Sequence, residues 1–172
     1  MRNIVLIGFM GTGKSVVGKA LARRLQRPFV DVDERIEQAA GRPIRTIFVE
    51  AGEAAFRRME RAMIEEVARG AGQVMATGGG AVLDEANLAA LKANGWLVWL
   101  KAAPDVILQR IGDPSSRPLL NVQDPKGRLT ELLGLRQATY AKADVVVETS
   151  ARSIQDVVEN ILQLMPPAKE AS

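Results

Sequence analysis

NIVLIGFMGTGKSVVGKALARRL, residues 3–25, is the stretch of the chain that decides the fold. Its first five residues form an apolar run of the length of a buried strand. Glycines follow at positions 8, 11 and 13, and Val17, Leu21 and Leu25 then recur at helical spacing. A strand, a glycine-rich turn and a helix in this order predict the first unit of a parallel α/β sheet.

The rest of the chain repeats this alternation of short apolar runs and amphipathic segments. Strands are predicted at residues 28–33, 73–77, 96–100 and 144–148, with helices at 35–40, 53–69, 84–93, 104–111, 128–143 and 153–164. Five buried strands separated by helices predict an α/β fold with three α/β/α layers and a five-stranded parallel sheet. We expect one domain over residues 1–165 and a loose tail over residues 166–172.

Composition restricts the classes of function. The 172 residues include 23 Lys and Arg against 20 Asp and Glu, a net charge of +3 that is scattered along the chain. This balance suits small anionic ligands, and seven aromatic residues offer little for stacking on nucleic-acid bases. We therefore expect a small-molecule substrate and no nucleic-acid partner.

The chain has no cysteine and no histidine. Thiolate chemistry, imidazole bases and the usual zinc sites are thereby excluded. Acid–base work must fall to carboxylates or lysine, and a metal must be held by oxygen, which favours Mg²⁺. The apolar N-terminal run is too short to cross a bilayer and lacks a signal-peptide cleavage site, so we expect a cytoplasmic protein with no membrane contact, and a monomer.

Residues 8–15, GFMGTGKS, fit the phosphate-binding pattern G-x-x-x-x-G-K-S/T between a strand and a helix. The backbone N–H groups of Gly11, Thr12 and Gly13 and the helix N-terminus are expected to bind phosphate oxygens. Lys14 is expected to bridge the β- and γ-phosphates, and the Ser15 hydroxyl to bind Mg²⁺. The motif predicts a nucleoside triphosphate but does not identify the acceptor.

Several charged residues are candidates for the acceptor side. Asp31 and Asp33 follow a predicted strand, and in an extended chain they point to one side about 6–7 Å apart. One carboxylate can then hold a water on Mg²⁺ while the other binds an acceptor hydroxyl; alternatively, both are solvated acids that cap the helix from Glu34. By spacing alone, Arg57 and Arg136 fit solvated helix faces.

Three consecutive glycines, Gly78, Gly79 and Gly80, follow the strand at residues 73–77. Either a ligand approaches them closely, or they permit a sharp turn into the helix that Asp84 caps. We expect both, with Gly79 next to the ligand and at least one of the other glycines serving the turn. The carboxyl ends of parallel strands meet at one edge of a sheet, so these glycines should neighbour the phosphate loop, the acids at 31–33 and the segment after Glu148. The long segment at residues 112–124 has no periodicity and is predicted to be a functional lid.

The chain resembles the shikimate kinase family over nearly its whole length. The similarity is carried, in the family's order and spacing, by GFMGTGKS, DVDERIE, IFVEAGEAAFRRME, ATGGGAV, RPLL and LRQATY. The first stretch is shared with many NTPases, and the combination of the others is far more specific. The resemblance implies a P-loop kinase of the chorismate pathway that uses Mg²⁺ and moves the γ-phosphoryl of ATP to the 3-hydroxyl of shikimate.

On the acceptor side, the resemblance implies that Asp33 binds the shikimate hydroxyls. Arg57 and Arg136 match the pair that grips the shikimate carboxylate. Gly79 matches a backbone donor beside the ring, with Gly78 and Gly80 as its neighbours in the site.

On the nucleotide side, the resemblance implies that Asp31 lies near Mg²⁺ and that Arg117 reaches the phosphates from the lid. Together with Lys14 and Asp33, Arg117 is the catalytic set that it implies. Arg110 and Arg152 match residues that flank the adenine. Val16 stands where many relatives carry Thr, a harmless departure if only its backbone N–H is used.

Two other functions share part of this pattern. Another small-molecule kinase, such as a gluconate kinase, would share the phosphate loop but not the full set of acceptor motifs. A nucleotide-dependent switch or partner-binding domain would bind ATP without transferring phosphate to a metabolite. The intact Lys14, Ser15, Asp33 and Arg117 argue against the second alternative.

Overall fold

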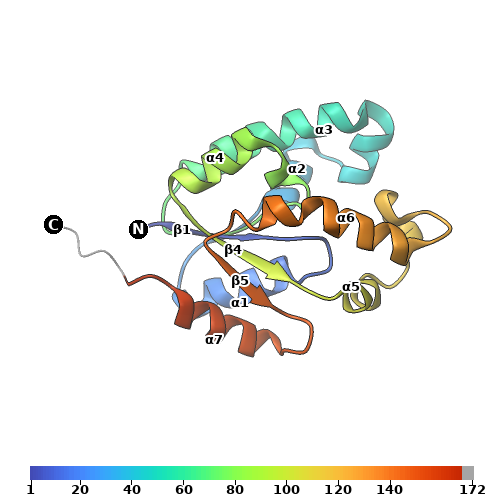
Figure 1. Cartoon of the computed structure of the whole chain (residues 1–172). Coiled ribbons are helices and arrows are strands. Elements are labelled where there is room, and N and C mark those ends of the chain that lie inside the picture. Colours follow the sequence, from blue (N-terminus) through green and yellow to red (C-terminus); the bar gives the residue numbers. More distant parts are fainter. Residues whose placement is uncertain (168–172) are drawn as a thin grey trace.

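A five-stranded sheet forms the centre of the computed structural model, which describes residues 1–167 without the side chains at positions 116 and 118 (Figure 1). The strands stand in the order β2-β3-β1-β4-β5, and every neighbouring pair is parallel. Their bounds are β1 (Asn3–Ile7), β2 (Phe29–Asp31), β3 (Val74–Ala76), β4 (Gly95–Lys101) and β5 (Val145–Glu148). The predicted five-stranded parallel sheet is confirmed.

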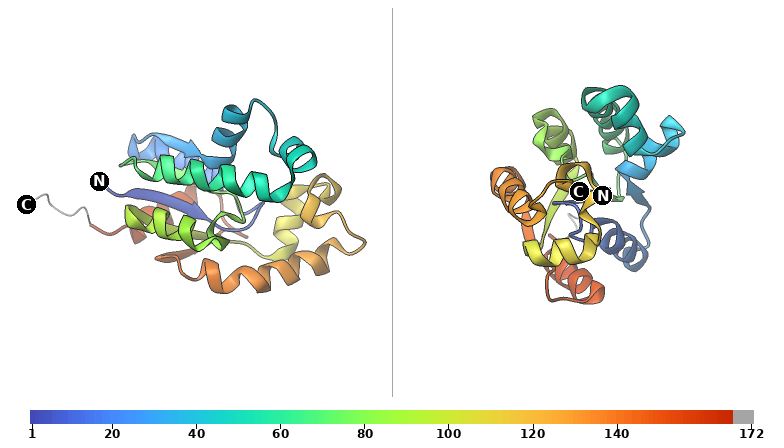
Figure 2. Two further views of the ribbon diagram at one scale, coloured as in Figure 1. Left: turned by 90° about the horizontal axis from the view of Figure 1, so that it is seen from above. Right: turned by 90° about the vertical axis from the view of Figure 1, so that its right-hand side faces the viewer.

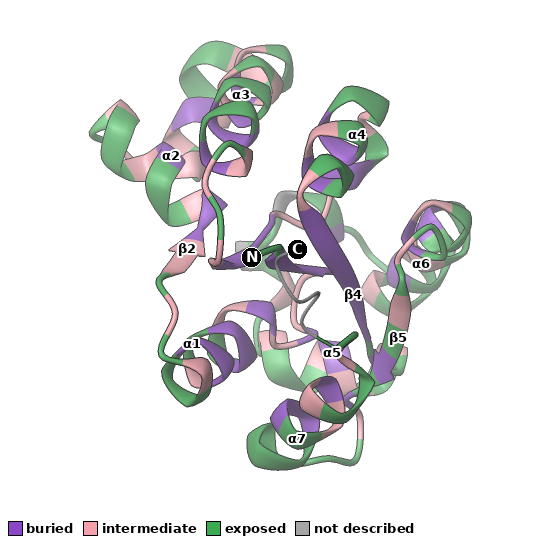
Figure 3. Cartoon of the chain, turned by 90° about the vertical axis from the view of Figure 1, so that its left-hand side faces the viewer, coloured by how far each residue is buried: buried purple, intermediate pink, exposed green. Residues whose placement is uncertain are grey.

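Helices cover both faces of this sheet (Figures 2 and 3). They are α1 (Lys14–Leu25), α2 (Val32–Ala40), α3 (Ile44–Ala68), α4 (Glu85–Ala93), α5 (Pro104–Ile111), α6 (Pro125–Tyr140) and α7 (Ile154–Leu164). Successive side chains of a strand point to opposite faces. Accordingly, Ile4 and Leu6 of β1 pack with residues of α1 and α7, whereas Val5 and Ile7 pack with residues of the other helices. The three predicted layers are confirmed.

The start of α2 differs from the sequence-based prediction. The strand predicted to reach Asp33 ends at Asp31, and the helix begins at Val32. The Asp31 carboxylate caps this helix by accepting hydrogen bonds from the backbone N–H groups of Asp33 at 3.1 Å and Glu34 at 3.3 Å. The prediction that Asp31 and Asp33 share one side of an extended chain was therefore wrong, because capping turns the chain into a helix between them.

The segment before residue 53 is also more helical than predicted. Helical structure continues from Ile44 to Ala68, with non-helical backbone at Gly52, where φ is 82° and ψ is 169°. A φ in this range favours glycine, so Gly52 allows two helices to meet at a kink. The predicted helix at residues 53–69 is the longer of the two parts.

The predicted lid at residues 112–124 contains short structure of its own. Two 3₁₀ turns, Pro114–Ser116 and Pro118–Leu120, lie between α5 and α6. Asp113 caps the first turn by accepting a hydrogen bond from the Ser115 backbone N–H at 2.9 Å. Asp124 caps α6, which begins three residues before the predicted start at Arg128.

The remaining helix ends follow the prediction closely. Asp84 caps α4, as expected, and Ser153 caps α7 through a reciprocal capping box with Asp156. Of the predicted tail at residues 166–172, residues 168–172 lie outside the described part of the chain. Within residues 1–167, no helix has both the length and the apolar character needed to cross a bilayer.

Candidate active site

The candidate site lies at the carboxyl ends of β2, β3 and β1, which are neighbours in the sheet. β1 leads into the phosphate loop, β2 into Asp31, and β3 into the three glycines. The segment after β5 joins them, because the Thr149 hydroxyl donates a hydrogen bond to the backbone carbonyl of Thr12 at 3.3 Å. The predicted meeting of these four segments at one edge of the sheet is confirmed.

The phosphate loop has a backbone that glycine favours. Gly8, Gly11 and Gly13 have φ values of 139°, 73° and 95°. Gly13 stands at the N-terminus of α1, and no side chain caps the first N–H groups of that helix. Uncapped N–H groups on a glycine-rich turn are an anion-binding arrangement.

Lys14 lies inside this loop rather than in solvent. Its ammonium donates a hydrogen bond to the Phe9 carbonyl at 2.7 Å, and 9% of the residue's surface is exposed. Burial lowers the pKa of Lys14 to about 8, and the carboxylates of Asp33 and Asp31 oppose this shift. The backbone thus holds the Lys14 ammonium within the loop. An anionic phosphate bound there would supply the negative charge that favours the protonated form of Lys14.

Ser15 and Asp31 form a pair of hard oxygen ligands. The Ser15 hydroxyl donates to Asp31 Oδ2 at 2.5 Å, while Oδ1 of the same carboxylate caps α2. In the described part of the chain, no three or more acidic side chains gather in a way that would hold a metal. A hydroxyl and one carboxylate suit Mg²⁺, which usually keeps several waters and binds phosphate oxygens rather than an all-protein cage.

Asp33 presents a carboxylate oxygen that nothing satisfies. Its Oδ1 is buried and accepts no hydrogen bond within residues 1–167. Burial raises the pKa of Asp33 to about 6, with Asp31 and Glu60 acting in the same direction and Lys14 in the opposite one. This buried oxygen lies next to the phosphate loop and has no hydrogen-bond donor in the described part of the chain. It could accept a hydrogen bond from the hydroxyl group of a molecule that is to be phosphorylated.

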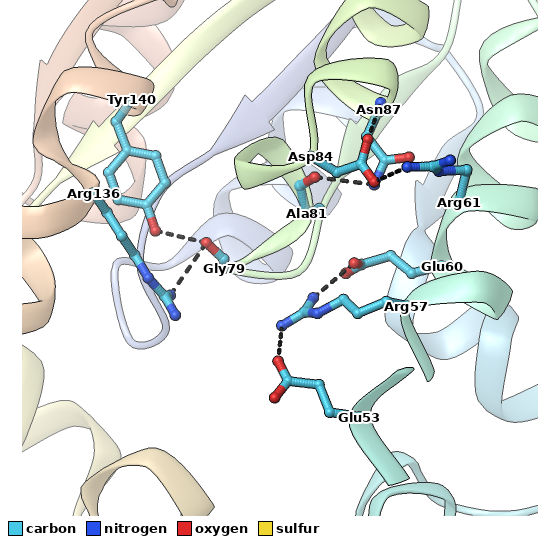
Figure 4. Close-up of polar contacts among 10 residues, drawn as sticks. All are labelled: Glu53, Arg57, Glu60, Arg61, Gly79, Ala81, Asp84, Asn87, Arg136 and Tyr140. Atoms are coloured by element: carbon cyan, nitrogen blue, oxygen red, sulfur yellow. Dashed lines mark hydrogen bonds and ion pairs between the residues drawn. The ribbon is translucent and has the colours of Figure 1, made fainter. Parts of the chain in front are cut away.

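Arg57 is held by two carboxylates of its own helix. Its guanidinium donates to Glu60 Oε2 at 2.7 Å and to Glu53 Oε1 at 3.4 Å (Figure 4). Glu60 is 1% exposed, and its other oxygen accepts no hydrogen bond within the described residues. Arg57 is therefore half-buried against Glu60 and not on the fully solvated face that spacing alone favoured.

Arg136 lies on the opposite side of the glycine segment. It is 8% exposed, and its guanidinium carbon lies 5.1 Å from the centre of the Phe9 ring in the phosphate loop. Its Nη1 also lies 3.4 Å from the Gly79 carbonyl oxygen. The structure thus brings Arg57, Arg136 and Asp33 to the same three glycines.

Close contacts with protein atoms explain why residues 78–80 are glycines. The predicted sharp turn is present at residues 79–80, where the Ala81 N–H donates to the Gly78 carbonyl at 3.1 Å, although none of the three glycines has a positive φ. A β-carbon at Gly78 would lie 2.9 Å from Asp33 Oδ1, and one at Gly80 would lie 2.7 Å from Arg57 Nη2. A β-carbon at Gly79 would lie 3.3 Å from the Met10 backbone nitrogen in the phosphate loop. In each case the nearest atoms that a β-carbon would meet belong to the protein.

The predicted nucleotide residues are spread more widely. Arg110 donates to the Thr149 carbonyl at 2.7 Å and lies 3.4 Å from the Gly11 carbonyl, so it adjoins the phosphate loop. Arg152 instead donates to Asn160 of α7 at 2.8 Å. Arg117 is exposed between the two 3₁₀ turns, and 54% of Val16 is exposed at the start of α1. Their roles toward ATP stay predictions.

Comparison with known proteins agrees with this geometry. A family model described as shikimate kinase matches residues 10–166. The shikimate kinase of Caldanaerobacter subterraneus subsp. tengcongensis is 44% identical over 163 residues, which cover 95% of each chain. That of Desulforudis audaxviator is 47% identical, covering 96% of this chain and 87% of the relative.

Solved structures give the same result. The chain is similar to the structure described as shikimate kinase from Acinetobacter baumannii in complex with shikimate, with a TM-score of 0.91 and 39% identity over 95% of this chain and 92% of that one. This chain belongs to the shikimate kinase family. As a member of the shikimate kinase family it is an ATP-using phosphotransferase.

A gluconokinase from Sinorhizobium meliloti has a TM-score of 0.58 at 20% identity. At this level of identity the likeness shows a shared fold and nothing about the acceptor.

The sequence analysis did not identify two buried residues that adjoin the candidate site. Glu60 follows Arg57 by three positions and interrupts an apolar stripe that includes Phe56 and Met63, which is a signal that could have found it. Tyr140 ends the stretch LRQATY, and its hydroxyl donates to the Gly79 carbonyl at 2.6 Å. Its place in this stretch, one of those that carry the family resemblance, was the signal that could have found it.

Proposed function

We propose that this chain transfers the γ-phosphoryl group of ATP to the 3-hydroxyl of shikimate, giving shikimate 3-phosphate and ADP. The observation that carries the proposal is the arrangement of Asp33, Arg57 and Arg136 around Gly78–Gly80, directly beside the phosphate loop. Shikimate is a small anion with three hydroxyls. Two guanidinium groups suit its carboxylate, and an unpartnered carboxylate suits a hydroxyl.

The phosphate loop is proposed to hold the triphosphate. Backbone N–H groups of Gly11, Thr12 and Gly13 donate to phosphate oxygens, and Lys14 neutralises charge between the β- and γ-phosphates. Binding of the anion stabilises the charged form of Lys14, which burial alone disfavours. The short bond between Lys14 and the Phe9 carbonyl supports this role, because it keeps the ammonium within the loop.

Mg²⁺ is proposed to bind at Ser15 and Asp31, and when bound it would neutralise phosphate charge. The hydroxyl and carboxylate oxygens of this pair support the proposal, since they lie 2.5 Å apart and are both hard ligands. The Asp31 carboxylate is held in place by the N–H groups at the start of α2.

Asp33 is proposed to accept a hydrogen bond from the 3-hydroxyl and to orient its oxygen toward the γ-phosphorus. In the transfer, the bond from this oxygen to the γ-phosphorus forms as the bond from the γ-phosphorus to the bridging oxygen of ADP breaks, and the hydroxyl proton passes to the Asp33 carboxylate. A loose transition state demands positioning and charge neutralisation more than a strong base. The unsatisfied Oδ1 of Asp33 supports this role.

Closure of residues 112–124 over the phosphates is proposed to exclude water, which competes with the acceptor. Arg117 would then add positive charge beside the transferring group. Arg110 and Arg152 are proposed to flank the adenine, with Val16 contributing only its backbone. Support for Arg110 comes from its contacts with Gly11 and Thr149, whereas that for Arg152 rests on the resemblance alone.

We further propose that residues 1–165 act as one domain and as a monomer. All the acceptor and phosphate-loop residues come from one chain, which supports a site that is complete without a second copy. Size-exclusion chromatography with light scattering tests the oligomeric state. A dimer at assay concentrations would contradict this proposal.

The test of function is an acceptor panel. Purified protein with Mg·ATP is given shikimate, quinate, gluconate or nucleoside monophosphates, and ADP release is followed. We expect release only with shikimate above the ATP-only background, and none from a folded Lys14→Met variant. Release with gluconate instead would favour the gluconate kinase alternative, and no release above background with any acceptor would favour a non-catalytic nucleotide-binding role.

A further inference from the structure

We propose that Tyr140 is a positioning residue of the acceptor site, which holds the Gly79 carbonyl and so leaves most N–H groups of the Arg136 guanidinium for the carboxylate of the acceptor. Tyr140 is not expected to touch the acceptor itself. The inference rests on the proposed function of this site, and it adds a residue that the phosphate-loop and acceptor motifs do not assign.

The first observation is the quality of the hydrogen bond from Tyr140. The hydroxyl donates to the Gly79 carbonyl oxygen at 2.6 Å, at the short end of the range for such bonds. The side chain has no exposed surface, and its ring lies 5.6 Å from the ring of Trp99 in β4. Burial raises the pKa of the Tyr140 hydroxyl, which keeps it a donor.

The second observation is that Arg136 is a weaker donor to the same oxygen. Residues 136 and 140 lie one turn apart on α6, so their side chains emerge on the same face. Arg136 Nη1 lies 3.4 Å from the Gly79 oxygen, a marginal distance compared with the 2.6 Å of Tyr140 (Figure 4). The tyrosine is the principal donor, and the guanidinium, which also donates weakly through Nη1, keeps its other N–H groups for another acceptor.

The third observation concerns the peptide between Gly79 and Gly80. In a trans peptide the N–H points opposite to the carbonyl, so fixing the Gly79 carbonyl toward α6 turns the Gly80 N–H away from α6. Within residues 1–167 this N–H donates no hydrogen bond to the backbone. Arg57 lies next to Gly80, since a β-carbon there would be 2.7 Å from Arg57 Nη2. One hydroxyl thus orders a peptide N–H between the two arginines.

Removal of the hydroxyl has a defined consequence. A buried carbonyl without its donor is costly, and Arg136 is the nearest replacement donor. Its guanidinium would move onto the Gly79 oxygen and away from the acceptor's carboxylate. A tyrosine that only filled space against Trp99 would lose little function when replaced by phenylalanine, because the ring remains.

The test is Tyr140→Phe, with Thr77→Val as the matched control. Thr77 also carries a buried hydroxyl and directly precedes the glycines, but its hydroxyl bonds to the Leu6 carbonyl at 3.4 Å and not to Gly79. Shikimate and ADP dissociation constants are measured by calorimetry, below the melting transition of each variant. For Tyr140→Phe we expect shikimate binding about tenfold weaker with ADP binding unchanged, on the scale of one hydrogen bond. Thr77→Val should bind both ligands as the wild type does.

A second measurement does not require the variant to fold. Tyr140 is the single tyrosine of the chain, so biosynthetic incorporation of fluorotyrosine labels this position alone. We expect its fluorine NMR signal to shift when shikimate saturates the protein. A signal that shikimate leaves unmoved would overturn the proposal.

The two possible failures are distinguishable. Wild-type protein that binds shikimate, together with Tyr140→Phe protein that binds it equally well, would overturn the role of Tyr140 and leave the proposed function intact. Wild-type protein that does not bind shikimate would overturn the proposed function, and the inference with it.

Discussion

At the scale of single residues, the site holds two charges that burial disfavours. Burial lowers the pKa of Lys14 to about 8 and raises that of Asp33 to about 6. Each group is thereby moved toward its neutral form in the free protein, although each is opposite in charge to the other. A ligand that brings phosphate to one and a hydroxyl to the other would relieve both costs.

Asp33→Asn is therefore expected to stabilise the free protein at neutral pH. The folded-state pKa of about 6 lies above the ordinary value of 3.8, so the native state holds the proton more tightly. The stabilisation by the protonated form is complete below about pH 4, falls as the pH rises toward 6, and is lost above it. Asparagine does not ionise, so the variant should gain about 3 kcal/mol at pH 7 and little at acidic pH, about 3.5.

Thermal melting of the ligand-free protein at both pH values checks this prediction. A gain of that size corresponds to a higher melting temperature by several degrees at neutral pH. A variant that melts below the wild type by the same margin at both pH values would contradict it.

Arg136→Lys is expected to be a severe change in spite of the retained charge. A guanidinium can hold a carboxylate through two parallel bonds and can stack on Phe9, whereas an ammonium does neither as well. The loss should be about 1.5–3 kcal/mol in shikimate binding, the scale of one charged hydrogen bond. Steady-state kinetics of the variant should show a raised KM for shikimate and an unchanged KM for ATP. If the variant and the wild type had the same KM for shikimate, Arg136 would not be a residue of the shikimate site.

At the scale of elements, the segment of three glycines connects the two halves of the site. Gly78 adjoins the carboxylates of Asp33 and Glu60, Gly79 adjoins the phosphate-loop backbone, and Gly80 adjoins Arg57. Close packing on three sides leaves no room for side chains. A side chain added at each of the three positions would therefore press on a different part of the site.

Gly79→Ala and Gly80→Ala are expected to separate these contacts. The β-carbon at Gly79 would press on the Met10 backbone at 3.3 Å, so nucleotide and shikimate binding should both weaken several-fold. The β-carbon at Gly80 would meet the movable end of Arg57 at 2.7 Å, so shikimate binding alone should weaken. Calorimetry with ADP and with shikimate distinguishes the variants. Normal ADP binding by Gly79→Ala would show that its β-carbon enters ligand space instead.

The proposed lid at residues 112–124 is expected to act on the rate of transfer rather than on substrate binding. Arg117 stands between two 3₁₀ turns and is exposed in the free protein. A residue that meets charge developing during transfer acts on the transition state. Arg117→Ala is thus expected to lower kcat by about tenfold or more while shikimate affinity changes little. Direct titration that placed the whole loss in shikimate affinity would make Arg117 a binding residue.

Sequence patterns predicted elements better than their boundaries. Apolar runs and helical spacing indicated all five strands and the succession of helices, because burial against a sheet requires those periods. The capping of α2 by Asp31 was one of two interpretations of the same acids, and only backbone geometry decides between them. The 3₁₀ turns in the lid have no periodic signal to detect.

At the scale of the whole molecule, the order of the strands assembles the site. β2, β3 and β1 are adjacent, so Asp31, the glycine segment and the phosphate loop meet although they are distant in sequence. The parallel-sheet rule predicted this meeting in outline. It did not predict which atoms would lack partners, because contacts such as those of Glu60 and Tyr140 depend on how helices pack against each other.

The central claim is that the acceptor residues direct phosphate to one hydroxyl of shikimate. The most direct measurement is NMR identification of the product after reaction with Mg·ATP and shikimate, since ADP release alone does not reveal which oxygen is phosphorylated. We predict a single product, with phosphorus coupled to the hydrogen on the carbon that bears the 3-hydroxyl, formed in an amount equal to ADP. ADP formed without phosphorylated shikimate, or phosphate on another hydroxyl, would contradict the claim.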